Sequence, residues 1–270
     1  MFVVASNITT RDVRISRIFQ EMQAANWNLE HESAAALRKM AEQCVAAGAD
    51  ALEINLQQRA DKPEAMKAAV DVVQLVTDRQ LCLSTNKAEV LEAGLKACQR
   101  PPLVNYVAID EARLRDMLPL IANYGAGVVL LVSDPAASSD VREMLQKAAV
   151  LFGTASEVGI PDDGILIDPG LIHITADIGQ RHLAEVKEFL RAFPEVFDPP
   201  VRSTCWLGNA SAGAPKRLRP VIETALLPML AGLGLSSVFM DVLQRENRRT
   251  VRLIKIFNNE TIYAEGDVVL

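Results

Sequence analysis

Short apolar runs that end in one small polar residue recur along this chain, each just before a segment with helical spacing. The runs are Leu52–Asn55, Leu81–Ser84, Leu103–Asn105, Ile165–Asp168 and Cys205–Asn209. If they are parallel strands, their carboxyl ends meet at one edge of the sheet, where such folds carry their binding chemistry. The pattern therefore predicts that small polar groups far apart in the sequence converge on one pocket.

Asp168 has the clearest chemical role among these polar tips. It follows three aliphatic residues and precedes Pro169 and Gly170, so we expect its carboxylate at a strand tip where the chain turns sharply. A carboxylate there can accept two parallel N–H bonds from a flat amidine-like edge, such as the 2-amino group and N3–H of a pterin or a guanine. The alternative is an aspartate that only caps the following turn. We interpret Asp168 as a binding residue.

Three asparagines end their runs in a similar way. Asn55 and Asn105 each offer a heterocycle both a donor and an acceptor, although either could instead be a turn residue. Asn209 comes directly after Gly208, which permits close approach of the backbone. Its amide could bond a ring nitrogen whose basicity changes during a reaction. We predict that these amides share the pocket with Asp168.

Other reactive residue types lack the spacing of a known site. Ser211 is not part of a G-x-S-x-G elbow, so a serine hydrolase is not indicated. No histidine lies at metal-ligand spacing, and no metal site is predicted. We interpret His173, which lies just after the Asp168 strand, as a solvated loop residue, with a place in the pocket wall as the alternative. Reduced, mostly buried thiols are expected at the four cysteines, which form no CxxC pair: Cys44, Cys82, Cys98 and Cys205.

The charge pattern points to a small ligand. A formal net charge of -6, from 28 Lys+Arg against 34 Asp+Glu, argues against a surface that neutralises a nucleic-acid backbone. Lys216, Arg217 and Arg219 form a local basic cluster shortly after Asn209. This cluster could attract an anionic tail at the open end of a barrel, and an ordinary exposed face explains it equally well.

The elements that must position these residues alternate along the chain. Strands are expected at about 2–5, 51–55, 81–84, 103–105, 127–132, 164–168, 202–207 and 237–240. Helices are expected over 33–47, 63–76 and 87–98, and from starts near Asp110, Ser139, Asp177, Arg219 and Arg245. About eight strand-then-helix units close a parallel sheet on itself. We predict an α/β fold, a (β/α)8 TIM barrel formed by residues 1–270 as a single domain, with a doubly wound open sheet as the alternative.

The positions of the glycines agree with this fold class. Helix caps are expected at the glycines that fall after helices and before strands: Gly48, Gly125, Gly159, Gly232 and Gly234. Neither G-x-G-x-x-G nor a Walker motif is present, so a dinucleotide or ATP site is not supported. Asn86 with Glu89 predicts a capping box. We find no signal-peptide pattern and no run of roughly 20 apolar residues, and expect a cytoplasmic protein without a membrane segment.

Taken together, these motifs resemble the pterin-binding barrel family, particularly the methyltetrahydrofolate:corrinoid protein methyltransferases and the folate domain of cobalamin-dependent methionine synthase. The resemblance runs from about residue 33 to 257, with the motifs in the right order and at similar spacing. The matching stretches are Ala51–Asn55, Leu81–Leu83 with Glu92–Lys96, Val104–Asn105, Ile167–Pro169 and Leu207–Ser211.

The resemblance implies a set of roles for these residues. Asn105 and Asp168 would hold the pterin edge, and Asn209 would act as the catalytic residue by hydrogen bonding N5 of the folate. A reduced Co(I) corrinoid on a partner protein would attack the N5 methyl group, while Asn209 stabilises the leaving nitrogen in the transition state. The remaining contacts that we predict for the substrate are Asn55, Ser84, Ser211, Asn7 and Arg217. A homodimer is also expected from the resemblance.

One departure from the family pattern and a likeness to a second enzyme keep other interpretations open. Ser84 stands where the family usually carries an Asp, which removes a charge-assisted contact worth about 1.5–3 kcal/mol. Dihydropteroate synthase shares the barrel and a strand that ends in Asp-Pro-Gly, and Asn7–Thr9 resembles its first loop, but its Ser-Arg-Lys-like motif is absent. The third hypothesis is a non-catalytic barrel that interacts with a pterin or a corrinoid.

Overall fold

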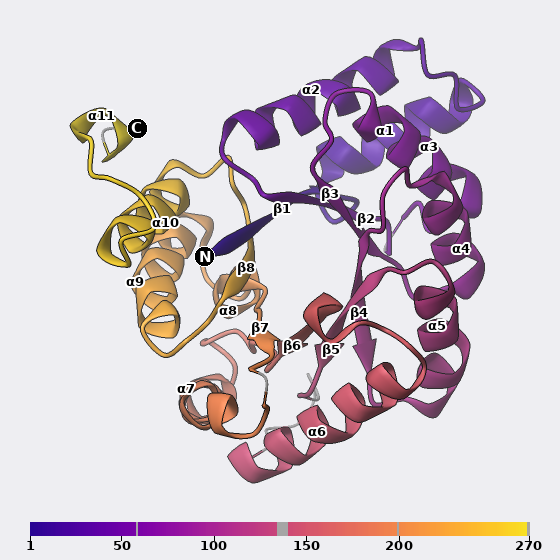
Figure 1. Cartoon of the computed structure of the whole chain (residues 1–270). Coiled ribbons are helices and arrows are strands. Elements are labelled where there is room, and N and C mark those ends of the chain that lie inside the picture. Colours follow the sequence, from indigo (N-terminus) through magenta and orange to yellow (C-terminus); the bar gives the residue numbers. More distant parts are fainter. Residues whose placement is uncertain (58, 134–139, 199, 269–270) are drawn as a thin grey trace.

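One parallel sheet organises the molecule. In the computed structural model, which describes residues 1–57, 59–133, 140–198 and 200–268, eight strands lie in the order β7-β6-β5-β4-β3-β2-β1-β8 (Figure 1). They are β1 Phe2–Thr9, β2 Ala51–Asn55, β3 Gln80–Ser84, β4 Leu103–Ala108, β5 Gly127–Leu131, β6 Ile165–Asp168, β7 Arg202–Ser203 and β8 Ser237–Met240. Every sequential pair from β1 to β7 is parallel, as is the pair of β1 with β8.

Hydroxyl groups and a single bridge close the circle between β7 and β8. The backbone N–H of Ser203 donates to Ser236 Oγ at 2.9 Å, and the hydroxyls of Ser236 and Ser237 donate back to the Ser203 carbonyl at 2.8 and 3.0 Å. Trp206 then forms an isolated parallel bridge with Phe239. The predicted (β/α)8 barrel is confirmed, and the doubly wound alternative is wrong.

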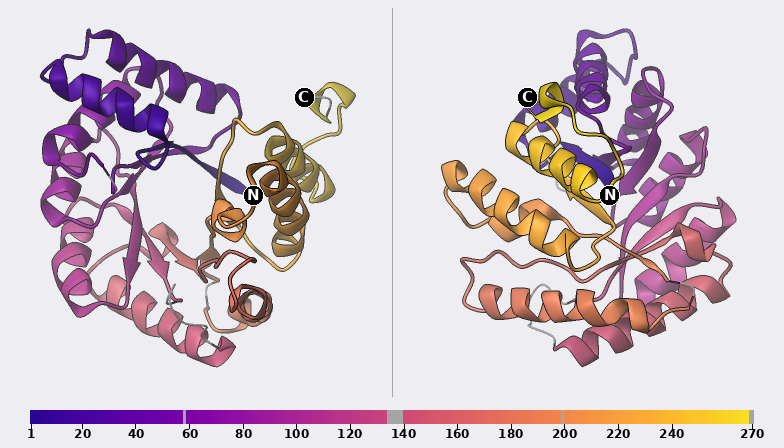
Figure 2. Two further views of the ribbon diagram at one scale, coloured as in Figure 1. Left: turned by 180° about the vertical axis from the view of Figure 1, so that it is seen from behind. Right: turned by 60° about the vertical axis from the view of Figure 1, so that its left-hand side comes forward.

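Helices form a ring around the sheet (Figure 2). They are α1 Val13–Ala24, α2 Glu32–Ala46, α3 Pro63–Gln74, α4 Ala88–Ala97, α5 Glu111–Asn123, α6 Val141–Glu157, α7 Gly179–Ala192, α8 Leu207–Ser211, α9 Arg219–Ala231, α10 Arg245–Phe257 and α11 Glu265–Val268. The start expected near Ser139 lies outside the described residues. No helix in the described ranges is both long and apolar enough to cross a membrane.

Helix α1 and strand β7 are among the elements that differ from the prediction. Helix α1 was not expected, because six of its twelve residues are polar; Ile15, Phe19 and Met22 nevertheless form a buried face, and the Asp12 side chain caps the amino terminus. The strand expected at 202–207 ends after two residues, and the chain turns into α8 at Leu207.

The helix caps are partly as expected. Gly48 follows α2 with φ of +93°, a conformation that favours glycine. The Asn86–Glu89 capping box is wrong, because Lys87 is the N-cap residue of α4 and its backbone N–H is bonded by Thr85 Oγ1 at 3.1 Å. The interpretation of the cysteines as free, mostly buried thiols is confirmed, with Cys98 only half-buried.

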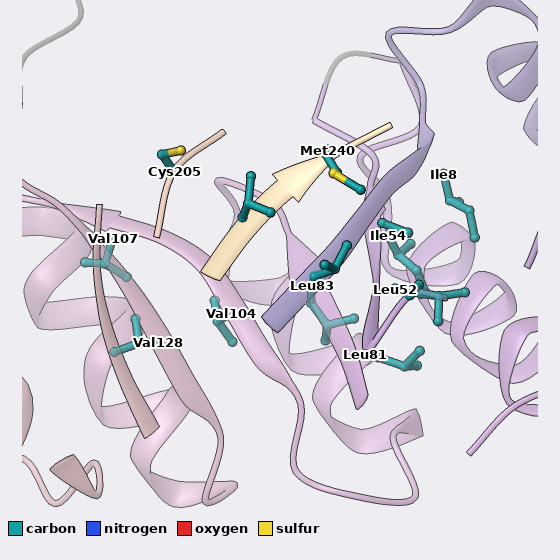
Figure 3. Close-up of a cluster of buried hydrophobic side chains, with 14 of the residues drawn as sticks. Ile8, Leu52, Ile54, Leu81, Leu83, Val104, Val107, Val128, Cys205 and Met240 are labelled. Atoms are coloured by element: carbon teal, nitrogen blue, oxygen red, sulfur yellow. The ribbon is translucent and has the colours of Figure 1, made fainter. Parts of the chain in front are cut away.

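Alternation along the strands separates two layers of side chains. Outward-facing residues such as Leu52, Ile54, Leu83 and Val104 belong to the large cluster packed between sheet and helices, part of which is drawn in Figure 3. The inward positions farther from the carboxyl ends of the strands form a separate apolar cluster: Val4, Ala51, Cys82, Leu103, Val129, Leu166 and Phe239. The inward positions nearer the carboxyl ends of β2, β3, β4 and β6 carry polar side chains instead. They are Glu53, Asn55, Ser84, Asn105 and Asp168.

Candidate functional site

A cavity of about 290 Å³ opens at the carboxyl ends of the strands. Asn55, Asn105, Asp168 and Asn209 all line it, although they come from β2, β4, β6 and α8. The other lining residues are Arg11, Gln57, Tyr106, Leu131, Ser133, Gly170, Leu171, Ile172, His173, Trp206 and Ala212. The tertiary structure thus brings four separated polar tips to one concave surface, where an α/β barrel carries its sites.

Asp168 is held at the cavity wall by its own turn. It is 7% exposed, and one carboxylate oxygen accepts the Gly170 backbone N–H at 2.7 Å. Burial raises the pKa of Asp168 to about 7, and the bond from Gly170 opposes part of that rise. A carboxylate with so little compensation is set up to gain from N–H donors brought by a ligand.

The turn that carries Asp168 is itself fixed from two sides. Gly170 has φ of +74°, and a Cβ there would lie 1.9 Å from Ser133 Oγ, so only glycine fits without displacement. The Gly170 carbonyl accepts a hydrogen bond from Nε2 of the buried His182 at 3.1 Å. Helix α7 therefore positions the Asp168 turn from outside the barrel.

Below the cavity, Glu53 joins the polar tips of three strands. Its Oε1 accepts hydrogen bonds from Asn55 Nδ2 at 3.2 Å, from Asn105 Nδ2 at 3.1 Å and from the Ser84 hydroxyl. Burial raises the pKa of Glu53 to about 7, and the bonds from Ser84, Asn105 and Asn55 oppose that rise. Glu53 and Ser84 therefore support the floor of the cavity without lining it, whereas Asn55 and Asn105 line it.

Aromatic and aliphatic groups form the sides of the cavity. The Arg11 guanidinium lies 5.1 Å from the centroid of the Trp206 ring, a cation–π distance. Tyr106, Leu131 and Leu171 add flat or apolar surface. Apolar walls with a few polar groups at one end suit a flat heterocycle with one hydrogen-bonding edge.

Asn209 stands on the opposite side from this network in a different environment. It lies in α8, is half-buried, and makes no side-chain hydrogen bond to the described residues. It also lines a second cavity of about 400 Å³, together with Arg11, Trp206 and Ala212. Lys216 and Arg219 of the basic cluster line this second cavity. Because the two cavities share lining residues, these cationic groups lie next to the first cavity as well.

The remaining predicted contacts lie outside the first cavity. Ser84 is fully buried beneath its floor and bonds Glu53. Asn7 joins β1 to the segment after β8, donating to Asp241 at 2.5 Å and accepting from the backbone of Val242 at 3.1 Å. Ser84 and Asn7 therefore bond other groups of the protein and do not line the first cavity.

Ser211 and Arg217 also lie away from the first cavity. The Ser211 hydroxyl donates to the buried Glu223 carboxylate at 2.5 Å at the edge of the second cavity. Arg217 is exposed and lines neither cavity. Within the described ranges, no three or more His, Cys, Asp or Glu side chains gather as metal ligands.

Sequence reasoning missed several residues of this site. Glu53 carried a readable signal, since a charged residue within a strand, two positions before Asn55, must point to the same face. His173 is a half-exposed loop residue that also lines the cavity, which was the alternative interpretation. Arg11 and Trp206 carried no signal, because their proximity depends on how β1 and α8 meet.

A family comparison agrees with this geometry. The model of the family described as "Pterin binding enzyme" matches residues 26–207, which is more than half of the chain. The chain belongs to the pterin-binding enzymes. The predicted family resemblance is thereby confirmed.

Individual relatives of this pterin-binding enzyme have low sequence identity to it. The chain is 24% identical over 186 residues to the methylcorrinoid:tetrahydrofolate methyltransferase of Eubacterium limosum, covering 68% of this chain and 67% of that protein. Similar folds include the dihydropteroate synthase of Xanthomonas albilineans with 4-aminobenzoic acid, at 17% identity and a TM-score of 0.68, over 97% and 94% of the two chains. The dihydropteroate synthase of Stenotrophomonas maltophilia has 18% identity and a TM-score of 0.66 over the same shares. These two structures support the fold alone.

Proposed function

We propose that this pterin-binding enzyme transfers the N5 methyl group between methyltetrahydrofolate and the cobalt of a corrinoid carried by a partner protein. The observation that carries the proposal is the shared cavity, which is lined by the acceptors of Asp168, Asn105 and Asn55 and by the amide of Asn209. The methyltransferase relative of Eubacterium limosum supports it.

The first step is recognition of the pterin edge. Asp168 would accept the 2-amino and N3–H donors of the pterin in two parallel charge-assisted bonds, and Asn105 would bond the same edge. The apolar and aromatic walls would cover the ring faces. Because each bond to a charged acceptor contributes about 1.5–3 kcal/mol, Asp168 is the main anchor.

The second step is methyl transfer. When it docks, the partner's corrinoid supplies the nucleophile for the methyl group. The N5 nitrogen is a poor leaving group, so charge that develops on it must be stabilised in the transition state. Asn209 can donate a hydrogen bond there from its side-chain amide, and this contribution does not depend on a titrating group near neutral pH.

Ser84 does not remove the case for pterin binding. The position lies under the cavity floor, and a buried carboxylate is present beside it in Glu53. The chain therefore keeps a carboxylate in this part of the barrel, on the strand next to that of Ser84.

Calorimetric titration with methyltetrahydrofolate tests the binding step, and spectrophotometric methyl transfer to reduced cobalamin tests the reaction. We expect saturable binding and methylation of cobalt. Absence of binding at millimolar ligand would sink the proposal. Binding without transfer, to free cobalamin or to corrinoid proteins, would favour the non-catalytic hypothesis.

A dihydropteroate synthase-like reaction is the second candidate. Asp168–Gly170 is compatible with it, and Arg11, Lys216 and Arg219 place cationic groups beside the cavity where an anionic leaving group could be held. Incubation with 4-aminobenzoic acid and a dihydropterin diphosphate, followed by chromatography for dihydropteroate, separates the two reactions. The basic cluster also remains a candidate contact for the anionic tail of a folate.

The assembly and location of the chain are part of the proposal. We propose a cytoplasmic homodimer that binds its corrinoid protein transiently. Light scattering during size-exclusion chromatography should give twice the chain mass of 29.5 kDa, and a monomeric mass would exclude the homodimer.

A further inference from the structure

The buried carboxylate below the cavity controls groups that a ligand would touch. Glu53 is 0% exposed, and a single oxygen, Oε1, accepts from the side chains of Asn55, Ser84 and Asn105. Two of these donors, Asn55 and Asn105, line the cavity. Glu53 thus contacts the ligand site only through them.

Asn105 donates both of its amide hydrogen atoms to groups below the cavity. Its Nδ2 donates one hydrogen to Glu53 Oε1 at 3.1 Å and the other to Ser84 Oγ at 3.2 Å. The Ser84 hydroxyl uses its own hydrogen on Glu53, so its oxygen can accept. An amide NH₂ has only two hydrogens, and both are used below the cavity. Asn105 therefore offers a ligand its carbonyl oxygen alone.

Asn55 is oriented in the same sense. Its Nδ2 donates to Glu53 Oε1 at 3.2 Å, and its Oδ1 accepts only a long bond of 3.4 Å from the Gln57 backbone. Together with the carboxylate of Asp168, the polar groups of this part of the cavity act mainly as acceptors. A matching ligand edge must supply N–H donors.

The cost of burying Glu53 indicates that its position has a function. Its Oε2 has no hydrogen-bond partner among the described residues, and burial raises the pKa of Glu53 to about 7. An unsatisfied buried carboxylate oxygen destabilises the folded state, and an apolar residue of similar volume would avoid that cost. The three donors that converge on Oε1 are the contacts that an apolar residue could not make.

We propose that Glu53 is a positioning residue that sets ligand specificity. By holding the amide of Asn105 in one orientation, it makes the cavity prefer a pteridine with an amino donor at position 2 over a pteridine with an oxo acceptor at the same position. The inference rests on the proposed function in that the ligand is a pteridine. It extends that function by naming the residue that distinguishes an amino from an oxo edge.

Two probes differ at this edge: 6,7-dimethylpterin carries a 2-amino group beside an unprotonated N1, and 6,7-dimethyllumazine carries a 2-oxo group beside an N1–H. Their dissociation constants are measured by calorimetry on the full chain, with thermal unfolding of each variant as a folding check. We expect the wild type to prefer the pterin at least tenfold. A ratio near one, a preference for the lumazine, or no binding of either probe at millimolar concentration would overturn the inference.

Variants of the network assign the preference to Glu53. Glu53→Met removes the acceptor at similar volume, so the Asn105 amide can turn and the ratio should fall at least threefold, while Asp168 retains the rest of the preference. Glu53→Gln keeps an oxygen in the position of Oε1 and should retain most of the preference. Glu223→Met is the matched control, because it removes another buried carboxylate, which accepts from Ser211 and Asn247 and not from Asn105, and we expect less than a threefold change in the ratio.

A folded Glu53→Met variant that keeps the wild-type ratio would show that Glu53 is only structural. If this variant fails to fold, Glu53→Asp, which withdraws the carboxylate by one methylene, supplies the same measurement. A chain with the Glu53-dependent pterin preference that transfers no methyl group contradicts the proposed function alone. A chain that transfers the methyl group while Glu53→Met leaves the ratio unchanged contradicts this inference alone.

Discussion

The two sides of the cavity are built in different ways. On the β2–β4 side, parallel ladders pair Asn55 with Ser84 and continue to Asn105, and the polar side chains bond one another through Glu53. On the β7–β8 side, β7 has two residues, and Asn209 stands on a five-residue helix without a side-chain hydrogen bond to the described residues. Recognition groups are thus ordered before a ligand arrives, whereas the proposed catalytic amide stays free to respond to it.

The largest expected effect is at Asp168, which lies on β6 between these two sides. Asp168→Asn should weaken methyltetrahydrofolate binding by roughly 100-fold, because it replaces a charged acceptor of two N–H bonds by a neutral amide. Calorimetric titration measures the loss. Asp78→Asn, at an exposed carboxylate, is the control and should bind as the wild type does. An affinity within threefold of the wild type would remove Asp168 from the recognition site.

Asn209→Ala tests the free side, with a somewhat smaller effect. We expect kcat of methyl transfer to fall by about 10- to 100-fold while KM stays within about twofold, because the bond to N5 matters in the transition state. Steady-state kinetics separate the two constants, and Asn123→Ala on the exposed end of α5 serves as the control. Equal losses in affinity and in turnover would contradict the difference between the two sides.

The pH dependence of binding sharpens the comparison further. The pKa of Asp168 is about 7 in the free chain, and N–H donors bind its ionised form, so affinity should rise up to tenfold per pH unit from about pH 5.5 and level off above about pH 7. Titrations at several pH values measure this slope, and Asp168→Asn should flatten it.

Stability should change in the opposite direction. The folded pKa of Asp168 lies above the ordinary value of 3.8, so between about pH 4 and 7 the unfolded chain has lost a proton that the folded chain retains. The free energy of unfolding therefore declines as pH rises through this window. Denaturant titrations of the ligand-free chain should show the decline, and Glu53 should contribute to it in the same sense. A stability that rises with pH between 4 and 7 would contradict these buried acids.

The smallest effect is expected at a matched pair of glycines. Gly170→Ala should destabilise the chain by about 1–2 kcal/mol, because φ is +74° and the new Cβ meets Ser133. Gly153→Ala, in α6 where nothing lies within 4 Å of an added Cβ, should stabilise it by about 0.5–1 kcal/mol. Thermal unfolding compares the two variants, and equal shifts would show that the Asp168 turn is not specially constrained.

Local patterns were sufficient for most of the fold. The strands β2, β3 and β8 and the helices α2 to α4 lie within two residues of their predicted bounds, because each has a clear apolar period. Helix α1 was missed because half of its residues are polar, and β7 was predicted too long because an apolar run does not reveal where a strand turns into a helix. The convergence of Asp168 with Asn105 followed from one rule, that parallel strands share an edge.

By itself, the sequence determined which residues alternate to one face of each strand and which polar tips end those strands, since both depend on neighbours within a few positions. Only the tertiary structure decided how the tips contact one another. Glu53 is 31 residues from Ser84 and 52 from Asn105, and their hydrogen bonds depend on the register of β2, β3 and β4. That register places the acceptor under the cavity, and it also leaves Asn209 outside the network.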